Sequence, residues 1–141
     1  MRKILVPVDG SENANRALAF AVAAAKENPA ISLLIVNVQF PIRAGLVHEL
    51  IGNDLIDKFY ADEGNKILEP AGGFARKNSV NFTVKVAVGV TSETVADCVR
   101  QENCDHVVMG TRGVDAMKNV ILGSVAYQVI HLVDVPVTVV R

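Results

Sequence analysis

The sequence has little of the chemistry that often marks a specialised protein. Its 141 residues include no tryptophan, two cysteines and 5% aromatic residues. Cys98 and Cys104 do not form a C-x-x-C pair, so a disulfide or a zinc site is not expected. We interpret both as small buried side chains of a protein in a reducing, cytoplasmic compartment.

An excess of one charge is also lacking. Fourteen basic residues nearly balance fifteen acidic ones, so neither nucleic acid nor a membrane surface is an expected partner. No apolar stretch approaches the ~18 residues that span a bilayer, and Asp9 interrupts the short apolar run near the start, unlike a signal peptide. With 50% hydrophobic residues, residues 1–141 are expected to form a single cytoplasmic domain.

Short apolar runs predict a parallel sheet. Most are continuously apolar, as in strands that are covered on both faces. The predicted strands are residues 4–8, 32–38, 81–88, 106–109 and 135–140. Between these strands, apolar residues recur at helical spacing. The predicted helices begin after Ser11, which serves as an N-cap, at Thr91 and at Ser124. This alternation predicts an α/β fold with helices on both faces of the sheet.

Residues 48–78 carry a weaker pattern. The segment holds four glycines and a proline, which cost about 1 kcal/mol per glycine and about 3 kcal/mol for proline inside a helix. These residues are Gly52, Gly64, Pro70, Gly72 and Gly73. We therefore expect a broken or kinked helix here.

A glycine motif follows the fourth predicted strand. Met109-Gly110-Thr111-Arg112-Gly113 is separated by nine residues from Gly123-Ser124, where a helix begins. Unpaired N–H groups and the dipole make a helix N-terminus an anion site, and glycine lets a phosphate approach the backbone. Arg112 adds a fork of donors, and the hydroxyl of Thr111 or Ser124 could ligate Mg²⁺. The alternative is a tight turn followed by a plain helix cap.

Asp9 directly follows the first predicted strand. It is either a carboxylate at the ligand-binding edge of the sheet or a turn former in Asp9-Gly10-Ser11, and the two roles are compatible. If strands one and four are neighbours, Asp9 and Gly110 flank one crevice. Asp9 would then accept a hydrogen bond from a ribose hydroxyl or the adenine amine.

Four blocks of the sequence resemble the universal stress protein family. They are residues 4–11, 109–113, 122–125 and 135–137. The glycines match the G-x2-G-x9-G-[ST] pattern of ATP-binding members, although the spacing fits neither the P-loop nor the dinucleotide motif. The resemblance implies a doubly wound sheet of five strands in the order 3-2-1-4-5, and homodimers that commonly form through the last strand.

The resemblance also implies roles for individual residues. The adenosine side would be lined by Pro7, Val8, Asp9 and the backbone of Val38, the ribose by Met109 and Gly110, and the phosphates by Gly113, Gly123, Ser124 and Val125. The donor chemistry of Arg112 adds that residue to the phosphate side. Asp115 departs from the family pattern by placing a carboxylate near the phosphates. The resemblance makes ATP the expected ligand, with Mg²⁺ bound to its phosphates. The Asp115 carboxylate leaves AMP and ADP as alternatives.

The favoured function is a nucleotide-binding regulatory or stress-response protein with little or no hydrolysis. One alternative is a nucleotide-free dimeric interaction protein of the same fold. Another is a weak ATPase in which Asp9 or Asp115 orients water. No nucleophile motif indicates a dedicated enzyme, and His48, His106 and His131 are too far apart in the sequence to suggest a metal site.

Overall fold

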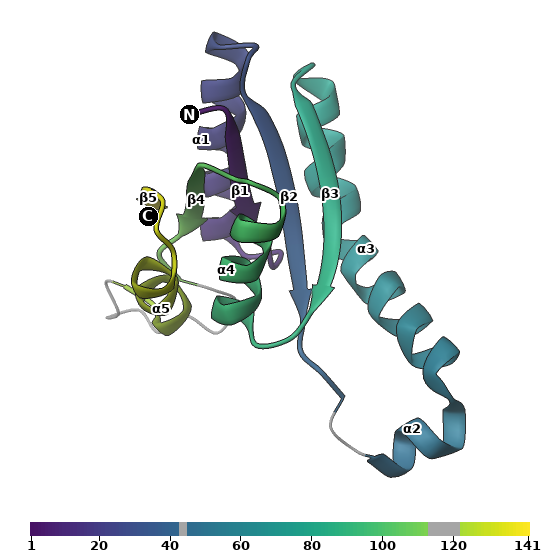
Figure 1. The fold of residues 1–141 in the computed structure, drawn as a ribbon. Coiled ribbons are helices and arrows are strands. Elements are labelled where there is room, and N and C mark those ends of the chain that lie inside the picture. Colours follow the sequence, from purple (N-terminus) through teal and green to yellow (C-terminus); the bar gives the residue numbers. More distant parts are fainter. Residues whose placement is uncertain (43–44, 113–121) are drawn as a thin grey trace.

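The fold is built on one parallel sheet. The computed structural model describes residues 1–42, 45–112 and 122–141, and its strands run in the order β3-β2-β1-β4-β5 (Figure 1). Their bounds are Lys3–Pro7 for β1, Ser32–Gln39 for β2, Asn81–Val88 for β3, His106–Gly110 for β4 and Val137–Val140 for β5. All neighbouring strands pair in parallel. The predicted fold class and strand order are confirmed.

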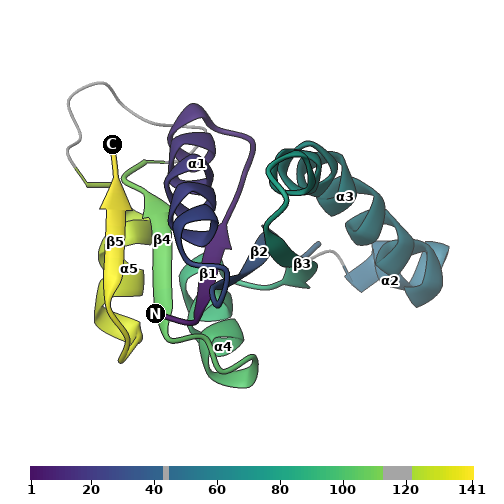
Figure 2. The same cartoon turned by 90° about the horizontal axis from the view of Figure 1, so that it is seen from above.

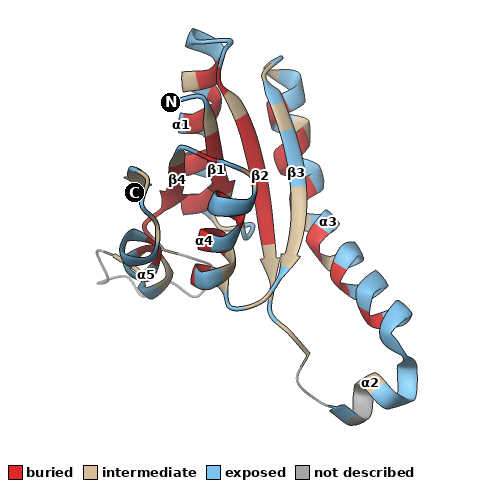
Figure 3. Ribbon diagram, in the orientation of Figure 1, coloured by how far each residue is buried: buried red, intermediate tan, exposed pale blue. Residues whose placement is uncertain are grey.

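Helices cover both faces of the sheet. Figure 2 shows α1 (Glu12–Glu27) and α3 (Asn53–Lys77) on one face, with α4 (Thr91–Gln101) and α5 (Ser124–Leu132) on the other. Successive strand residues point to opposite faces, so Ile4 belongs to the core under α1 while Leu5 belongs to the core under α4 and α5. This explains why the central strands read as continuously apolar, and Figure 3 shows burial concentrated there.

Helix α1 follows directly from its sequence. The side chain of Ser11 accepts a hydrogen bond from the Ala14 N–H and caps the helix, and Glu12 places a carboxylate in the first turn. Its buried stripe is dominated by alanine, which lets the helix lie close to β1 and β4. The predicted helix end at Asn28 is confirmed.

The segment between β2 and β3 differs partly from expectation. Helix α2 (Gly45–Ile51) is separated from α3 by Gly52, whose φ of 78° explains the predicted break. The expectation of a broken helix is thus met at Gly52 alone, because α3 continues through Gly64, Pro70 and both later glycines. A Cβ at Gly64 would lie 2.5 Å from Cγ2 of Val86, so glycine permits close packing on β3. This packing offsets the low helix propensity.

The last strand is shorter than predicted. It begins at Val137 rather than at residue 135, because Pro136 precedes it and only its carbonyl takes part, accepting the Val107 N–H at 3.0 Å. The amino end of α3, together with α2, extends past the sheet and is largely exposed (Figure 3). Across the described ranges, none of the helices has the length and apolar character to cross a membrane.

Candidate functional site

The strand order creates a switch point at the carboxyl edge of the sheet. Strands β1 and β4 pair directly, with Ile4 opposite His106. The chain leaves β1 for α1 on one face, whereas the helix after β4 is α5 on the other face. Ligands of open α/β sheets bind where connections diverge in this way. The condition for Asp9 and Gly110 to flank one site is therefore met.

The turn after β1 is ordered by Asp9. Its Oδ1 accepts the N–H of Ser11 at 2.9 Å, and Gly10 between them has a φ of 84°. The turn-forming role predicted for Asp9 is thus confirmed, and its carboxylate remains exposed to solvent at the switch point. A single side chain can therefore shape the turn and present negative charge to a ligand.

The neighbouring predicted residues are less accessible. Pro7 and Val38 are half-buried, whereas the Val8 side chain is buried in the core under α1. The Val8 N–H donates to the carbonyl of Val36 at 2.8 Å, and its carbonyl accepts from Nδ2 of Asn37 at 2.9 Å. Val8 therefore supports the edge of the sheet more than it lines an open surface.

At the end of β4, Met109 and Gly110 are both buried. The Met109 side chain packs into the core under α4 and α5. A Cβ at Gly110 would lie 2.8 Å from the carbonyl carbon of Asn13 in α1. The structure thus gives Gly110 a packing role, in which glycine lets α1 cross close to β4.

The N-terminus of α5 has a different character. Gly123 is its N-cap with a φ of −71°, and no side chain caps the helix. A Cβ at Gly123 would lie 2.9 Å from the carbonyl oxygen of Thr111, which accepts the Gly123 N–H. Ser124 is exposed and Val125 is half-buried. The first N–H groups of α5 thus have no side-chain cap among the described residues, as an anion site requires.

Three further residues of the predicted motif need separate mention. Arg112 is half-buried directly after Thr111, at the carboxyl edge. Gly113 and Asp115 lie outside the described residues. Thr111, which was considered as a Mg²⁺ ligand, is only 6% exposed, and its hydroxyl accepts a hydrogen bond from Asn13. Of the two hydroxyls considered, only that of Ser124 belongs to an exposed residue.

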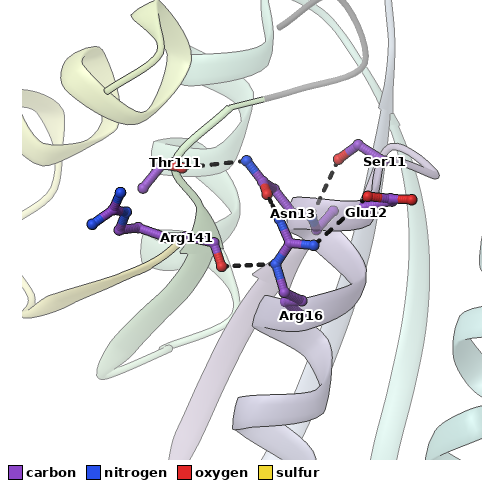
Figure 4. A network of polar contacts seen from close by, with 7 residues as sticks. Ser11, Glu12, Asn13, Arg16, Thr111 and Arg141 are labelled. Atoms are coloured by element: carbon purple, nitrogen blue, oxygen red, sulfur yellow. Dashed lines mark hydrogen bonds and ion pairs between the residues drawn. The ribbon is translucent and has the colours of Figure 1, made fainter. Parts of the chain in front are cut away.

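Sequence reasoning missed a buried polar network that joins the site to the rest of the fold. Asn13 donates through Nδ2 to Oγ1 of Thr111 at 3.3 Å and accepts from the guanidinium of Arg16 (Figure 4). On the other side of β1, buried Asn37 bonds to the carbonyl of Val8. The sequence did hold a signal for this network: Asn37 lies inside an apolar strand, and Asn13 lies beside the apolar stripe of a helix. A polar side chain at such a position is expected to be buried and hydrogen-bonded.

The described residues offer no obvious nucleophile or metal centre. Cys98 and Cys104 are buried and free, as predicted, and burial raises the pKa of the Cys104 thiol to about 11. Burial also lowers the pKa of His106, whose ring contacts the hydroxyl of Thr138. Within the described parts of the chain, no three His, Cys, Asp or Glu side chains gather in a way that could hold a metal ion.

Comparison with known proteins identifies the family. The model of the universal stress protein family matches residues 1–141. The chain belongs to this family. Universal stress protein YxiE of Bacillus subtilis is 32% identical over 147 residues, covering 99% of this chain and 98% of the relative. MJ0531 of Methanocaldococcus jannaschii is 31% identical over 141 residues, covering 99% and 82% respectively.

Solved structures share the fold throughout. MJ0577 has a TM-score of 0.84 at 29% identity, covering 99% of this universal stress protein and 94% of that chain. Three more distant structures contain ligands: an Archaeoglobus fulgidus protein with dAMP, an Arabidopsis thaliana family protein with AMP, and a universal stress protein with cAMP. Their identities are 23%, 18% and 22%, with TM-scores of 0.71, 0.70 and 0.73, so they are alike in fold.

Proposed function

We propose that this universal stress protein binds an adenine nucleotide at the carboxyl edge of β1 and β4. The observation that carries the proposal is the N-terminus of α5 at the switch point of the sheet, which has a glycine N-cap and, among the described residues, no side-chain cap. A phosphate would supply the acceptors that this helix end lacks. The exposed carboxylate of Asp9 would accept a hydrogen bond from the ribose or the base.

Related structures support the chemical class of the ligand. The three relatives of the same fold that contain ligands hold AMP, dAMP or cAMP, all of which are adenine nucleotides. The glycine spacing favours ATP for this chain, with Mg²⁺ bound through the phosphates and the Ser124 hydroxyl. AMP and ADP remain the alternatives, because Asp115 adds a carboxylate to the phosphate side of the motif.

The residues of the site divide according to their burial. The residues that would act through backbone groups or as a packed floor are Pro7, Val8, Val38, Met109 and Gly110. The residues that would meet the phosphates are Arg112, Gly113, Gly123, Ser124 and Val125. In this proposal the nucleotide stabilises one form of the protein in a regulatory or stress-response role in the cytoplasm, with little or no hydrolysis.

The ligand can be tested directly. Protein purified under native conditions is denatured and the released small molecules are analysed by mass spectrometry. The protein is then titrated with ATP, ADP and AMP, each with and without Mg²⁺, by calorimetry. An adenine nucleotide in the extract or saturable binding would support the proposal. An empty extract together with no binding at millimolar nucleotide would refute it.

Asp9→Asn provides a matched variant for the adenosine side. Asparagine keeps the Oδ1 acceptor for the Ser11 N–H, so the turn is preserved while the charge is lost. Because hydrogen bonds to charged groups are stronger than neutral ones, we expect nucleotide affinity to fall about tenfold with the thermal midpoint unchanged. An unchanged affinity would remove Asp9 from the site.

The proposal includes a homodimer through the last strand. Among the described residues, β5 pairs with β4 and is the last strand of the sheet, so its other edge would offer hydrogen-bonding groups to a second copy. Sedimentation equilibrium over a wide concentration range, with and without ATP, measures the association. A protein that stays monomeric under all these conditions would contradict this part of the proposal.

A further inference from the structure

The beginning of the glycine motif is held by an unusual concentration of hydrogen bonds on one residue. Thr111 is 6% exposed and follows directly after β4. Its N–H donates to the carbonyl of Val140 in β5 at 2.9 Å, and its carbonyl accepts the N–H of Gly123, the N-cap of α5. Its hydroxyl accepts from Nδ2 of Asn13 in α1 at 3.3 Å. One residue therefore contacts α1, the N-cap of α5 and the end of β5.

The network continues from Asn13 to the end of the chain. Asn13, also 6% exposed, accepts a hydrogen bond at Oδ1 from the Arg16 guanidinium. The Nε of Arg16 donates to the main-chain oxygen of Arg141 at 2.7 Å, and another guanidinium nitrogen lies 3.8 Å from the Glu12 carboxylate. Figure 4 shows these contacts running from Thr111 at the start of the motif through Asn13 and Arg16 of α1 to Arg141, the residue after β5.

Close backbone contacts restrict the positions of Gly110 and Gly123, on either side of Thr111 in this network. A Cβ at Gly110 would lie 2.8 Å from the backbone of Asn13, and one at Gly123 would lie 2.9 Å from the carbonyl oxygen of Thr111. The backbones on both sides of Thr111 are thus in close contact with their neighbours. Because the Asn13 amide is buried, loss of its acceptor leaves an unsatisfied donor, and the segment has to move to restore a partner.

We infer that Thr111, held by Asn13, is the positioning residue that sets the N-terminus of α5 for the phosphates and links it to the end of β5. The inference rests on the proposed nucleotide function. It concerns the phosphate end of the ligand only, because the Thr111 contacts lead to Gly123 and Val140 rather than to Asp9. Phosphate binding should consequently change the hydrogen bonding at the carboxyl end of β5, and a change at that end should alter phosphate affinity.

Two substitutions at one position test this role. Thr111→Val keeps the shape and β-branching but removes the hydroxyl, whereas Thr111→Ser keeps the hydroxyl. We expect Thr111→Val to weaken binding of MgATP about tenfold and to leave binding of adenosine unchanged. Thr111→Ser should bind both as the unaltered protein does. An equal loss for MgATP and adenosine would indicate general destabilisation and overturn the inference.

A matched pair in α1 extends the test. Asn13→Ala removes the donor to Thr111, while Asn15→Ala makes the same chemical change at an exposed position of the same helix. The first should reproduce the selective loss of MgATP binding, and the second should not. If Asn13→Ala fails to fold, Arg16→Lys serves instead, since lysine keeps the charge but loses the fork that reaches Asn13 and Arg141.

Amide hydrogen exchange by NMR tests the positioning role without nucleotide. In the ligand-free protein, Thr111→Val should speed exchange of the Gly123 and Thr111 amides about fivefold relative to the Val107 amide. The Val107 amide bonds to Pro136 at the other end of the β4–β5 pair and reports general opening. Unaltered relative rates would overturn the inference even if ATP binds. Faster exchange together with an empty extract and no binding of ATP, ADP or AMP would instead refute the proposed function and retain the positioning of the α5 N-terminus by Thr111.

Discussion

Several helices begin at the carboxyl edge of the sheet, and two of them, α1 and α5, have N-termini that are completed in different ways. α1 follows β1 with Ser11 as its cap, accepting the Ala14 N–H at 3.2 Å, and with the Glu12 carboxylate in its first turn. α5 begins after Gly123 with no acidic residue in its first turn and with no cap from any side chain in residues 1–42, 45–112 and 122–141. Within the described residues, a side-chain cap and an acidic first turn thus complete the N-terminus of α1 but not that of α5, where, in the proposed function, a phosphate would supply the acceptor.

This difference refines the phosphate-loop hypothesis. The glycine at the end of β4 is explained by the approach of α1, since Gly110 meets the backbone of Asn13. The glycine that serves α5 combines a close contact with Thr111 and an open helix end. In the proposed function, Gly123 and Ser124 would therefore meet the anion, while Gly110 supplies the geometry that brings α1 close to β4.

The largest expected effect comes from placing a carboxylate at the N-terminus of α5. Ser124→Asp puts a carboxylate where the phosphate would bind, and unit charges 4 Å apart repel by about 4 kcal/mol at an effective dielectric constant of 20. ATP affinity should fall by about a hundredfold or more. The ligand-free protein should become about 0.3–1 kcal/mol more stable, because the dipole favours the carboxylate. Calorimetry and urea unfolding measure the two effects, and a loss of both binding and stability would contradict the comparison.

The second expected effect concerns the close contact at Gly123. Gly123→Ala places a Cβ near the Thr111 carbonyl oxygen, so the chain must shift, and we expect a loss of about 2 kcal/mol in stability together with weaker ATP binding. Gly73→Ala in α3 is the control, because no atom lies within 4 Å of the added Cβ and alanine favours a helix by about 0.5–1 kcal/mol. Equal stabilities for the two variants in urea unfolding would argue against the contact.

A third, smaller effect separates the two serines. Ser11→Ala removes the cap of α1 and should cost about 1 kcal/mol of stability while ATP affinity stays nearly constant. Ser124→Ala should leave the stability within about 0.5 kcal/mol and weaken ATP binding several-fold. Urea unfolding and calorimetry on both proteins give the complete pattern. If Ser11→Ala weakened ATP binding more than Ser124→Ala, the assignment of the phosphate site to the N-terminus of α5 would be wrong.

The sequence was informative where local chemistry decides the structure. Apolar runs identified the strands, Ser11 identified a helix start, and the glycine spacing located the beginning of α5. Strand order followed from the family resemblance, because periodicity alone does not say that β1 lies beside β4. That adjacency is what brings Asp9 and Gly110 to the same edge of the sheet.

Tertiary contacts decided the features that sequence reasoning missed. α3 passes through Gly64 and Pro70 because its packing on β3 outweighs local propensity, and a Cβ at Gly64 would lie 2.5 Å from Cγ2 of Val86. Asn13 gains its role from Thr111, a residue 98 positions further along the chain. A local pattern indicates that a buried amide needs a partner, but it does not identify the partner.

The smallest expected effect tests the Glu12 charge at the N-terminus of α1. Glu12→Gln removes the carboxylate from the first turn of α1 and should cost about 0.5 kcal/mol at low salt, from the helix dipole and the exposed pair with Arg16. Glu27→Gln, at the other end of the same helix, should be neutral or stabilising, because an acid is unfavourable there. Urea unfolding at low salt and in 1 M salt should show both differences shrinking as screening increases. A Glu12 effect that persists in high salt would mean that packing rather than charge completes this end, and the contrast with α5 would then rest on the Ser11 cap alone.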